Sequence, residues 1–486
     1  MRNMIGAIVL VGAAALGGAL WFQSRPAVAQ DTASVAALAA RVATLERDLR
    51  TLEDVNAIKK LQRTYGFYTD KQLWSQAADL FAADGTIEVG GRGVYAGRER
   101  IREFLALNGP ESPQPKRLFD HMQLQPIVHV AADGSTAHGR WHVFAQEAVH
   151  GEYANWGLGV LENEYVKEDD VWKIRRHHFF TTMYTPYDAG WGKTALPNAG
   201  PSAELPPDRP RSVDYAAYPS AFVVPFHYDN PVTTPAPRVG AGAVLIVDPA
   251  SSEALALARR LEAAGHDVRV IDARTVESLA AELAALDGRV GLLEDVAQLE
   301  RLNSIYGYYL AHLQWDDLTG IFSPTGSIEI AMRGVYVGAA SVRRNLNLYG
   351  QATDDQFGLQ HNHMQFQPVV TVAPDGQSAK VRSRALSIMG NWERSSQWMG
   401  GVYENDFVKE NGVWKIARDQ VFNTYFIPYT VGWKDVQPRP PPGITATNPP
   451  DLPPTLPFEM YPSAFLPPFH YANPVTGRPV IVPPTQ

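Results

Sequence analysis

An internal sequence repeat constrains the fold of this 486-residue chain more than any other feature. Three stretches recur in the same order: residues 52–55 at 293–296, residues 121–123 at 363–365, and residues 218–222 at 461–465. Their separation shifts by one residue at only two places, which chance does not produce over so long a span. A repeat of this kind decides the architecture before any local pattern is considered. We therefore predict two copies of one domain, each followed by its own tail.

Each copy contains the same succession of helical and strand patterns. Apolar residues from Leu38 to Val55 are spaced as on one helix face, a short helix follows Trp74, and another runs from about Arg98 to Leu107. A strand begins near Thr86, and turn signals then separate four longer strands, at about 121–130, 135–148, 156–167 and 171–182. This order predicts an α+β fold in which helices cover one face of a curved, mostly antiparallel sheet.

The segments outside the two copies have their own compositions. Residues 197–237 and 437–484 are rich in proline, which excludes regular helix and central strand. Because both end in nearly the same text, we expect extended arms that dock aromatic side chains on domain surfaces. These side chains are Phe222, Phe226, Tyr228, Phe465, Phe469 and Tyr471. A βαβ-like stretch before the second copy lacks a glycine-rich phosphate motif, so we interpret it as a connector.

The N-terminus has the pattern of an export signal. Arg2 precedes an apolar run from Met4 to Phe22, and small residues at 27 and 29 predict cleavage before Gln30. The protein is then periplasmic or secreted, with no stable membrane span after cleavage. The alternative is an uncleaved anchor in the inner membrane, since the run is nearly long enough to cross a bilayer.

These patterns divide the chain into six segments. They are a signal peptide at 1–29, a first domain with its leading helix at 30–192, a first arm at 193–234, a connector at 235–273, a second domain with its leading helix at 274–434, and a second arm at 435–486.

Composition excludes several classes of function. A net charge of −8 without a Lys/Arg block argues against a nucleic-acid or anionic-membrane partner. The absence of cysteine removes disulfides, thiol nucleophiles and cysteine-zinc sites. Histidines are frequent in the first copy, but none has the helical spacing of a metal motif such as HExxH. We therefore expect chemistry from His, Asp, Glu and Tyr, with no metal and no cofactor.

Four local motifs resemble SnoaL-like domains of the nuclear transport factor 2-like superfamily. They are the helix with Tyr65, Asp70 and Trp74, the turn at 81–85, the junction at 93–102 and the hairpin at 169–174. The superfamily includes scytalone dehydratase and ketosteroid isomerase, and its fold hosts enzymes and plain binding proteins alike. The resemblance implies a cone-shaped domain with one deep, mostly apolar pocket. It also implies an intramolecular pseudo-dimer packed through the sheets, because a covalent tandem raises the effective concentration for pairing.

The resemblance places Asp70 and His121 in that pocket as an acid–base pair. Such a pair suits proton abstraction beside a carbonyl, dehydration or activation of a water. Tyr65, earlier on the helix, is the candidate donor to a developing oxyanion. The second copy keeps His363 but has Ala311 at the position of Asp70, so we expect domain 1 to be active and domain 2 degenerate.

The sequence departs from the dehydratase pattern at the two tyrosines that position water there. They correspond to Thr69 and Val89 in this chain. The candidate substrate-binding residues are Tyr68, Trp74, Trp141, His142 and Trp156. The tryptophans at 74 and 156 recur in the second copy, which favours core packing or arm docking as an alternative.

Two functions follow from these residues. The first is a cofactor-free lyase, isomerase or hydrolase that acts on a hydrophobic small molecule in domain 1. The alternative is a non-catalytic module that binds a small molecule or a protein.

Overall fold

The computed structural model describes residues 27–229, 245–247, 256, 259, 268–270, 276–351 and 357–480. The predicted signal peptide, apart from residues 27–29, and most of the predicted connector lie outside these residues. The chain divides into two compact units. One contains residues 1–53 and 230–294, and the other contains 54–229 and 295–486.

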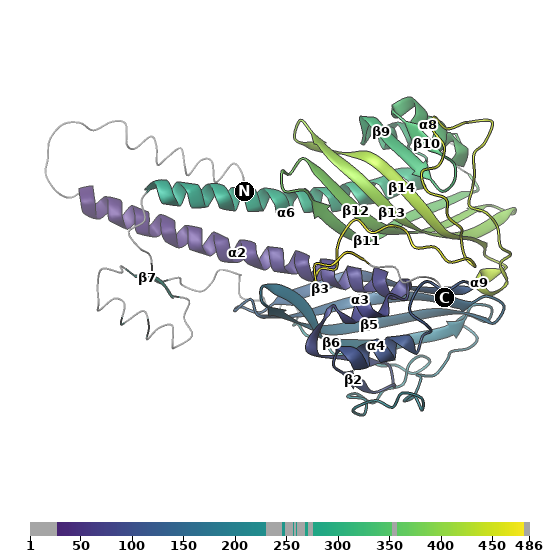
Figure 1. Cartoon of the computed structure of the whole chain (residues 1–486), viewed down its shortest axis with the longest axis horizontal. Helices are drawn as coiled ribbons and strands as arrows, with labels where there is room; N and C mark the ends of the chain where they lie inside the picture. The colour runs from purple at the N-terminus through teal and green to yellow at the C-terminus, as the bar shows by residue number, and fades with distance from the viewer. Residues whose placement is uncertain are drawn as a thin grey trace. The chain divides into compact units, whose positions relative to one another are not determined.

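Domain 1 is built on a mixed six-stranded sheet (Figure 1). Its elements are α2 (Ala27–Asp70), α3 (Trp74–Ala78), β1 (Phe81–Val89), β2 (Val94–Ala96), α4 (Arg98–Ala106), β3 (Arg117–Val130), β4 (Thr136–Val149), β5 (Tyr153–Glu168) and β6 (Val171–Pro186). The strand order is β2-β1-β6-β5-β4-β3, in which β1 and β6 are parallel and the other neighbours are antiparallel. The predicted order of elements and the α+β class are confirmed.

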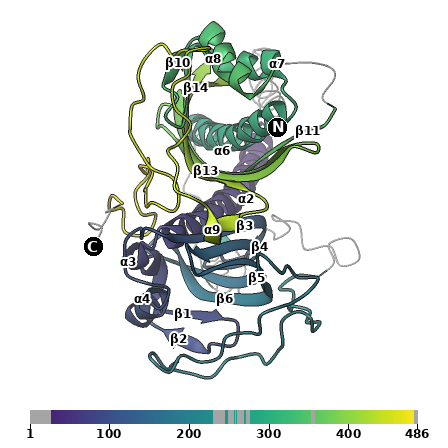
Figure 2. The same cartoon turned by 90° about the vertical axis from the view of Figure 1, so that its right-hand side faces the viewer.

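Domain 2 repeats this topology. Its elements are α6 (Val276–Ala311), α7 (Trp315–Gly320), β9 (Phe322–Ile330), β10 (Val335–Val337), α8 (Ala339–Leu346), the 3₁₀ turn η1 (Asn347–Tyr349), β11 (Leu359–Val372), β12 (Ser378–Asn391), β13 (Ser395–Glu410), β14 (Val413–Pro428) and α9 (Gly432–Asp435). Its strand order is β10-β9-β14-β13-β12-β11. Figure 2 shows α6 inside the curve of this sheet, which is the covered, cone-like arrangement that the sequence predicts.

Each leading helix is fixed to its own sheet by an apolar core and by buried polar contacts, one of which recurs in both domains. In domain 1, Ile58, Leu61 and Tyr65 of α2 pack with Phe81 and other buried residues. The indole of Trp172 donates a hydrogen bond to Asp54 at 2.8 Å, and Trp414 does the same to Asp295 at 2.8 Å in domain 2. The recurring tryptophans at these positions are therefore structural.

The unit formed by 1–53 and 230–294 joins the early turns of the two long helices. Val42 and Leu49 of α2 pack on Leu286 of α6, and Arg289 forms an ion pair with Glu53 at 2.6 Å. Two short strands, β7 (Leu245–Val247) and β8 (Val268–Val270), pair in parallel. Within the residues that the structure describes, no helix is both long enough and apolar enough to span a membrane.

Domains 1 and 2 belong to the same unit and share an apolar cluster. Leu118, Met122 and Trp156 of domain 1 pack with Leu386 and Tyr425 of domain 2. The Tyr425 hydroxyl also donates a hydrogen bond to Gln146 at 2.5 Å. These contacts fit an intramolecular pseudo-dimer.

The two arms dock to different extents. The second arm inserts Tyr471 into the core of domain 1, where the side chain is buried. The first arm stacks Phe222 on Phe180 of β6 at 5.9 Å between ring centroids. Phe226 departs from the expectation because it is 55% exposed, with the Arg140 guanidinium 4.0 Å from its ring centroid.

Candidate functional site

The cone of domain 1 encloses a cavity of about 290 Å³. Residues 196–199 of the first arm line part of it, together with α2, β1, α4 and the long strands. Its polar lining includes Tyr65, Arg92, His121, Glu147, His177 and Tyr184. Apolar side chains such as Leu161 and Phe179 form other parts of the wall. A small apolar cavity with a few convergent polar groups is typical of a ligand site.

Three polar side chains meet inside this cavity. His121 Nε2 lies 3.0 Å from Glu147 Oε1, and the Tyr184 hydroxyl donates to the same oxygen at 2.9 Å. The strand register explains the contact, since His121 pairs with Ala145 and Glu147 is its diagonal neighbour on the same face. A Cβ at Gly157 would lie 2.6 Å from the Tyr184 ring, so the glycine gives that ring its space.

The surroundings keep Glu147 ionised. Burial alone would raise its pKa, but the hydrogen bond and charge of His121, the Tyr184 hydroxyl and the Arg92 guanidinium together lower it. A carboxylate only accepts hydrogen bonds, so His121 donates its Nε2 proton to Glu147. The other ring nitrogen, Nδ1, is buried and has no hydrogen-bond partner among the described residues. His121 therefore holds Glu147 with one ring nitrogen and leaves the other without a protein partner among the residues that line the cavity.

Two further rings stay uncharged beside this group. Burial lowers the pKa of His177 to about 3, so the imidazole is neutral at physiological pH. Burial raises the pKa of Tyr65 above its ordinary value, which keeps its hydroxyl protonated. The two rings lie 4.6 Å apart between centroids.

Asp70 occupies a different environment from the predicted one. Its Oδ1 accepts a hydrogen bond from the backbone N–H of His121 at 2.7 Å, and its Oδ2 forms an ion pair with Arg384 of domain 2. Arg384 also pairs with Asp120 at 2.9 Å, and all three side chains are buried. The predicted meeting of the Asp70 carboxylate with the His121 imidazole is corrected: the carboxylate fixes the backbone of His121, and Glu147 is the carboxylate at its ring.

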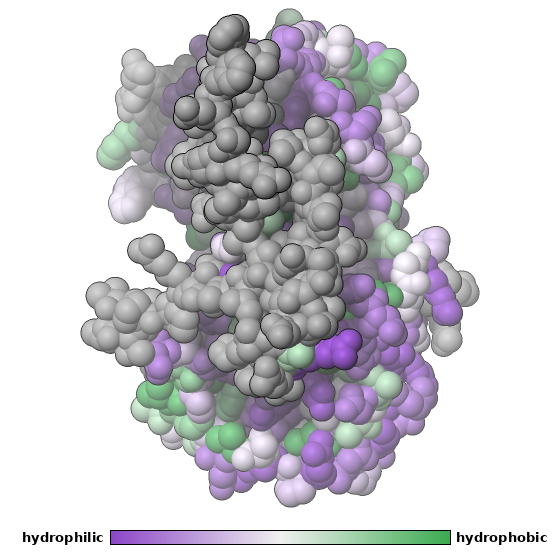
Figure 3. Space-filling view, turned by 90° about the vertical axis from the view of Figure 1, so that its left-hand side faces the viewer, coloured by the Kyte–Doolittle hydropathy of each residue, from purple (hydrophilic) through white to green (hydrophobic). Residues whose placement is uncertain are grey.

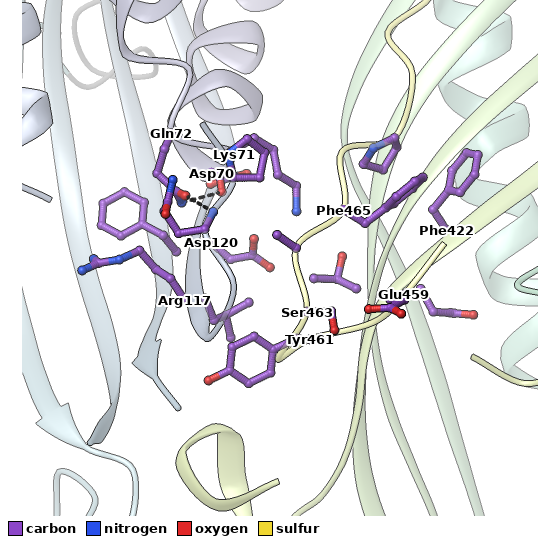
Figure 4. Close-up of a pocket in the computed structure, with 18 residues that line it drawn as sticks. Asp70, Lys71, Gln72, Arg117, Asp120, Phe422, Glu459, Tyr461, Ser463 and Phe465 are labelled. Atoms are coloured by element: carbon purple, nitrogen blue, oxygen red, sulfur yellow. Dashed lines mark hydrogen bonds between the residues drawn. The ribbon is translucent and has the colours of Figure 1, made fainter. Parts of the chain in front are cut away.

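The duplication gives the physical reason for this correction. Domain 2 has Ala311 at the position of Asp70, and domain 1 has His142 at the position of Arg384. Asp70 is thus present only in domain 1 and Arg384 only in domain 2, which is what a single ion pair between the two domains needs. Figure 4 shows Asp70, Lys71 and Asp120 facing the second arm across a cleft of about 30 Å³. That volume holds about one water, which excludes a substrate.

The other predicted site residues separate into two groups. Tyr65 and His121 line the cavity, whereas Tyr68, Trp74, Trp141, His142 and Trp156 are not among its lining residues in the described structure. Tyr68 packs on Phe469 of the second arm at 5.6 Å, and the Trp74 indole donates to Gly109 at 2.9 Å.

Strand direction accounts for the remaining three of these residues. Asn155 of β5 lines the cavity, so its neighbour Trp156 points the other way, into the cluster between the domains. His142 is likewise exposed between two inward positions of β4. Trp141 points inward but lies behind the wall, where it packs on Val143 and Leu161 and donates to the Tyr165 hydroxyl at 3.1 Å.

Sequence reasoning missed Glu147, Tyr184 and Arg92. A comparison of the copies gives the signal for two of them, because domain 2 has Met389 and Phe426 at the positions of Glu147 and Tyr184. Arg92 recurs as Arg333, so the comparison does not single it out.

Domain 2 fills the equivalent interior with larger side chains. Tyr403 replaces Leu161, and its hydroxyl lies 2.9 Å from His363 Nε2. Met399 replaces Gly157 and is buried in the core. Ser387 lies 2.6 Å from His363 Nδ1, so both ring nitrogens of this histidine are occupied. The histidine shared by the two copies is therefore available to a ligand in domain 1 alone.

Among the residues that the structure describes, no group of three or more His, Cys, Asp or Glu side chains is placed to hold a metal ion.

A family model described as "SnoaL-like domain" matches residues 50–178 and 292–419, which is more than half of the chain. The chain belongs to this family. Each match covers one of the two domains, so this chain contains the family's domain twice. The resemblance stated from the sequence is confirmed.

Three solved structures are similar to single domains of this chain. A scytalone dehydratase, named putative, from Novosphingobium aromaticivorans is 22% identical over 32% of this chain and 95% of its own, with a TM-score of 0.27. A hexachlorocyclohexane dehydrochlorinase, LinA type 2, is 18% identical over 29% and 91%, with a TM-score of 0.25. An aromatic ring hydroxylase, also named putative, from Novosphingobium aromaticivorans is 22% identical over 28% and 93%, with a TM-score of 0.25.

Proposed function

We propose that domain 1 is a cofactor-free lyase or isomerase that removes a proton from a hydrophobic small molecule. The observation that carries this proposal is the His121–Glu147–Tyr184 contact inside a largely apolar cavity. A carboxylate that accepts from one imidazole nitrogen leaves the other as a base and stabilises the imidazolium that forms. SnoaL-like family membership is consistent with enzymes of this type.

The geometry suggests how the chain's own groups act. His121 Nδ1 takes a proton from a carbon beside a carbonyl, while Glu147 accepts from Nε2–H throughout. The hydroxyl of Tyr65 and the guanidinium of Arg92 are donors toward the enolate oxygen. The imidazolium then returns its proton, either to a leaving hydroxyl, which departs as water, or to another carbon, which gives an isomer.

The experiment is a turnover screen with three classes of compound. Cyclic β-hydroxy ketones report dehydration, β,γ-unsaturated ketones report isomerisation, and 5-nitrobenzisoxazole reports removal of a carbon-bound proton by an enzyme base. With any compound that turns over, Glu147→Gln should lower kcat by about 100-fold or more. Glu152→Gln, on the exposed turn between β4 and β5, is the control with unchanged kcat. Full activity in Glu147→Gln, or no turnover in the entire screen, contradicts the proposal.

The binding-module reading is the alternative outcome of that screen. Saturable binding of these compounds without turnover would support it for a small molecule. For a protein partner, the face drawn in Figure 3 offers no specific support, because hydrophilic and hydrophobic residues are interspersed over its coloured surface.

We also propose export, on the sequence pattern of residues 1–29 alone. Expression of the full chain in a Gram-negative host should give a periplasmic protein whose intact mass is that of a chain beginning at Gln30. A membrane-bound protein that retains Met1 to Ala29 would instead support the anchored alternative.

A further inference from the structure

Domain 2 retains a cavity at the mouth of its cone, with a volume of about 430 Å³. Arg333, Tyr349, Met389, Phe426 and Arg439 are among its lining residues. The inner residues of domain 2 that correspond to the deep part of the domain 1 cavity do not line it in the described structure. It is therefore a shallower site above an interior that larger side chains have filled.

The charge of this cavity differs from that of its counterpart. Domain 1 has Arg92 with the Glu147 carboxylate, whereas domain 2 has Arg333 with Met389 at the carboxylate position. The second arm adds Arg439 to the domain 2 lining. No Asp or Glu is among the described residues that line this cavity, so two cationic groups lie there without a facing carboxylate.

Neither guanidinium group is neutralised by a carboxylate among the described residues. Arg333 lies 4.6 Å from the centroid of the Tyr349 ring, and its buried Nη1 has no hydrogen-bond partner among the described residues. Arg439 donates through Nη2 to the Phe426 carbonyl at 2.7 Å, and burial lowers its pKa. Neither arginine has an ion-pair partner within the described residues. Arg333 is half-buried, whereas Arg439 is exposed at the rim of the cavity. Because a partly buried charge without a partner is costly, an anion beside Arg333 would offset that cost.

We propose that this cavity binds a small organic anion, a carboxylate or sulfonate on an apolar or aromatic body, without converting it. Guanidinium groups bind planar anions through paired N–H donors, and the rings of Tyr349 and Phe426 suit an apolar body. Domain 2 lacks the counterparts of Glu147 and Tyr184, so it holds no base of the domain 1 kind. This inference does not depend on catalysis in domain 1.

Isothermal titration calorimetry of the full chain with 2-naphthoate and 2-naphthalenesulfonate tests the proposal. At least one of these anions should bind with a saturable isotherm, and neutral 2-naphthamide should bind at least about 10-fold more weakly. Arg333→Met and Arg439→Met should each weaken anion binding by about 10-fold or more. Arg394→Met, an exposed arginine on the turn between β12 and β13, is the matched control with unchanged affinity.

Adding a negative charge at one position makes the test specific to domain 2. Met389→Glu restores the carboxylate that domain 1 has, so it should abolish anion binding, whereas the neutral Met389→Gln should retain it. The proposal is overturned if neither anion binds, if 2-naphthamide binds as tightly as the anions, or if both arginine variants keep full affinity. Loss of binding in Arg92→Met with none in Arg333→Met would assign the anion to domain 1 and would also overturn it.

Discussion

Domains 1 and 2 share a fold, a leading helix and a histidine on the first long strand, β3 or β11, but they use their interiors differently. Domain 1 has Leu161 and Gly157 where domain 2 has larger side chains, and Glu147 and Tyr184 form the contact with His121. Domain 2 surrounds His363 with Tyr403 and Ser387 and closes the space. The residues that the two copies share therefore form the scaffold, whereas the residues that differ between them decide which cavity can do chemistry.

The same comparison reassigns Asp70. An acid present in one copy and absent from the other resembles a catalytic difference when only the sequence is considered. The structure shows that its partner, Arg384, is also present in one copy only. The asymmetry between the copies therefore has two sources, one in the cavity and one in the contact between domains.

The largest expected effect on stability is at that contact. Arg384→Met leaves the carboxylates of Asp70 and Asp120 buried without a cation, so the free energy of unfolding should fall by about 3–5 kcal/mol. His142→Met, at the equivalent exposed position, should change it by less than about 0.5 kcal/mol. Urea unfolding at pH 7 measures both. Equal effects of the two substitutions would contradict the one-sided contact.

The arms give the next largest difference. Tyr471 is buried in the core of domain 1, so Tyr471→Ala should lower the free energy of unfolding by about 3 kcal/mol. Phe226 is 55% exposed, so Phe226→Ala should cost about 1 kcal/mol or less, mainly through its contact with Arg140. Thermal and urea unfolding of both variants check this order. A larger loss for Phe226→Ala would show that the first arm is docked as firmly as the second.

Equivalent positions 177 and 419 give pH dependences of opposite sign. Burial lowers the pKa of His177 from 6.5 to about 3, so the unfolded chain binds the extra proton between these values and stability rises with pH. Burial raises the pKa of Asp419 from 3.8 to about 7, so the native state binds the extra proton and stability falls as pH rises through that range.

Urea unfolding of the wild type, His177→Asn and Asp419→Asn between pH 4 and 6.5 measures these contributions. The free energy of the wild type minus that of each variant should change by up to about 1.4 kcal/mol per pH unit. The slope should be positive for position 177 and negative for position 419. Slopes of the same sign would show that these two buried groups do not shift their pKa values in opposite directions.

Much of the fold could be predicted because it depends on local patterns that occur twice. The turn at Asp133-Gly134, the strand periodicity and the helix spacing each specify one element, and the second copy repeats them. The polar contacts inside the cavity could not be predicted in the same way. The contact between His121 and Glu147 depends on the register of β3 against β4, which the sequence alone does not specify.

The ion-pair partner of Asp70 could not be predicted from the sequence either. Arg384 is far from Asp70 in the sequence, and their contact exists only because the two domains pack together. Tyr68 and Trp156 illustrate the same limit, since an arm covers the first and the domain contact covers the second. A helix or strand pattern shows that a side chain is buried, but it does not show which neighbour buries it.

We propose that the cavity of domain 1, and not that of domain 2, performs the chemistry. The most direct test is to make the same substitution at the histidine that both copies share, and to measure kcat/KM for a compound found in the turnover screen. His121→Asn should lower kcat/KM by about 100-fold or more, and His363→Asn should leave it within about 2-fold of the wild type. Comparable losses in both variants, or a loss in His363→Asn alone with an unchanged thermal midpoint, would contradict the account.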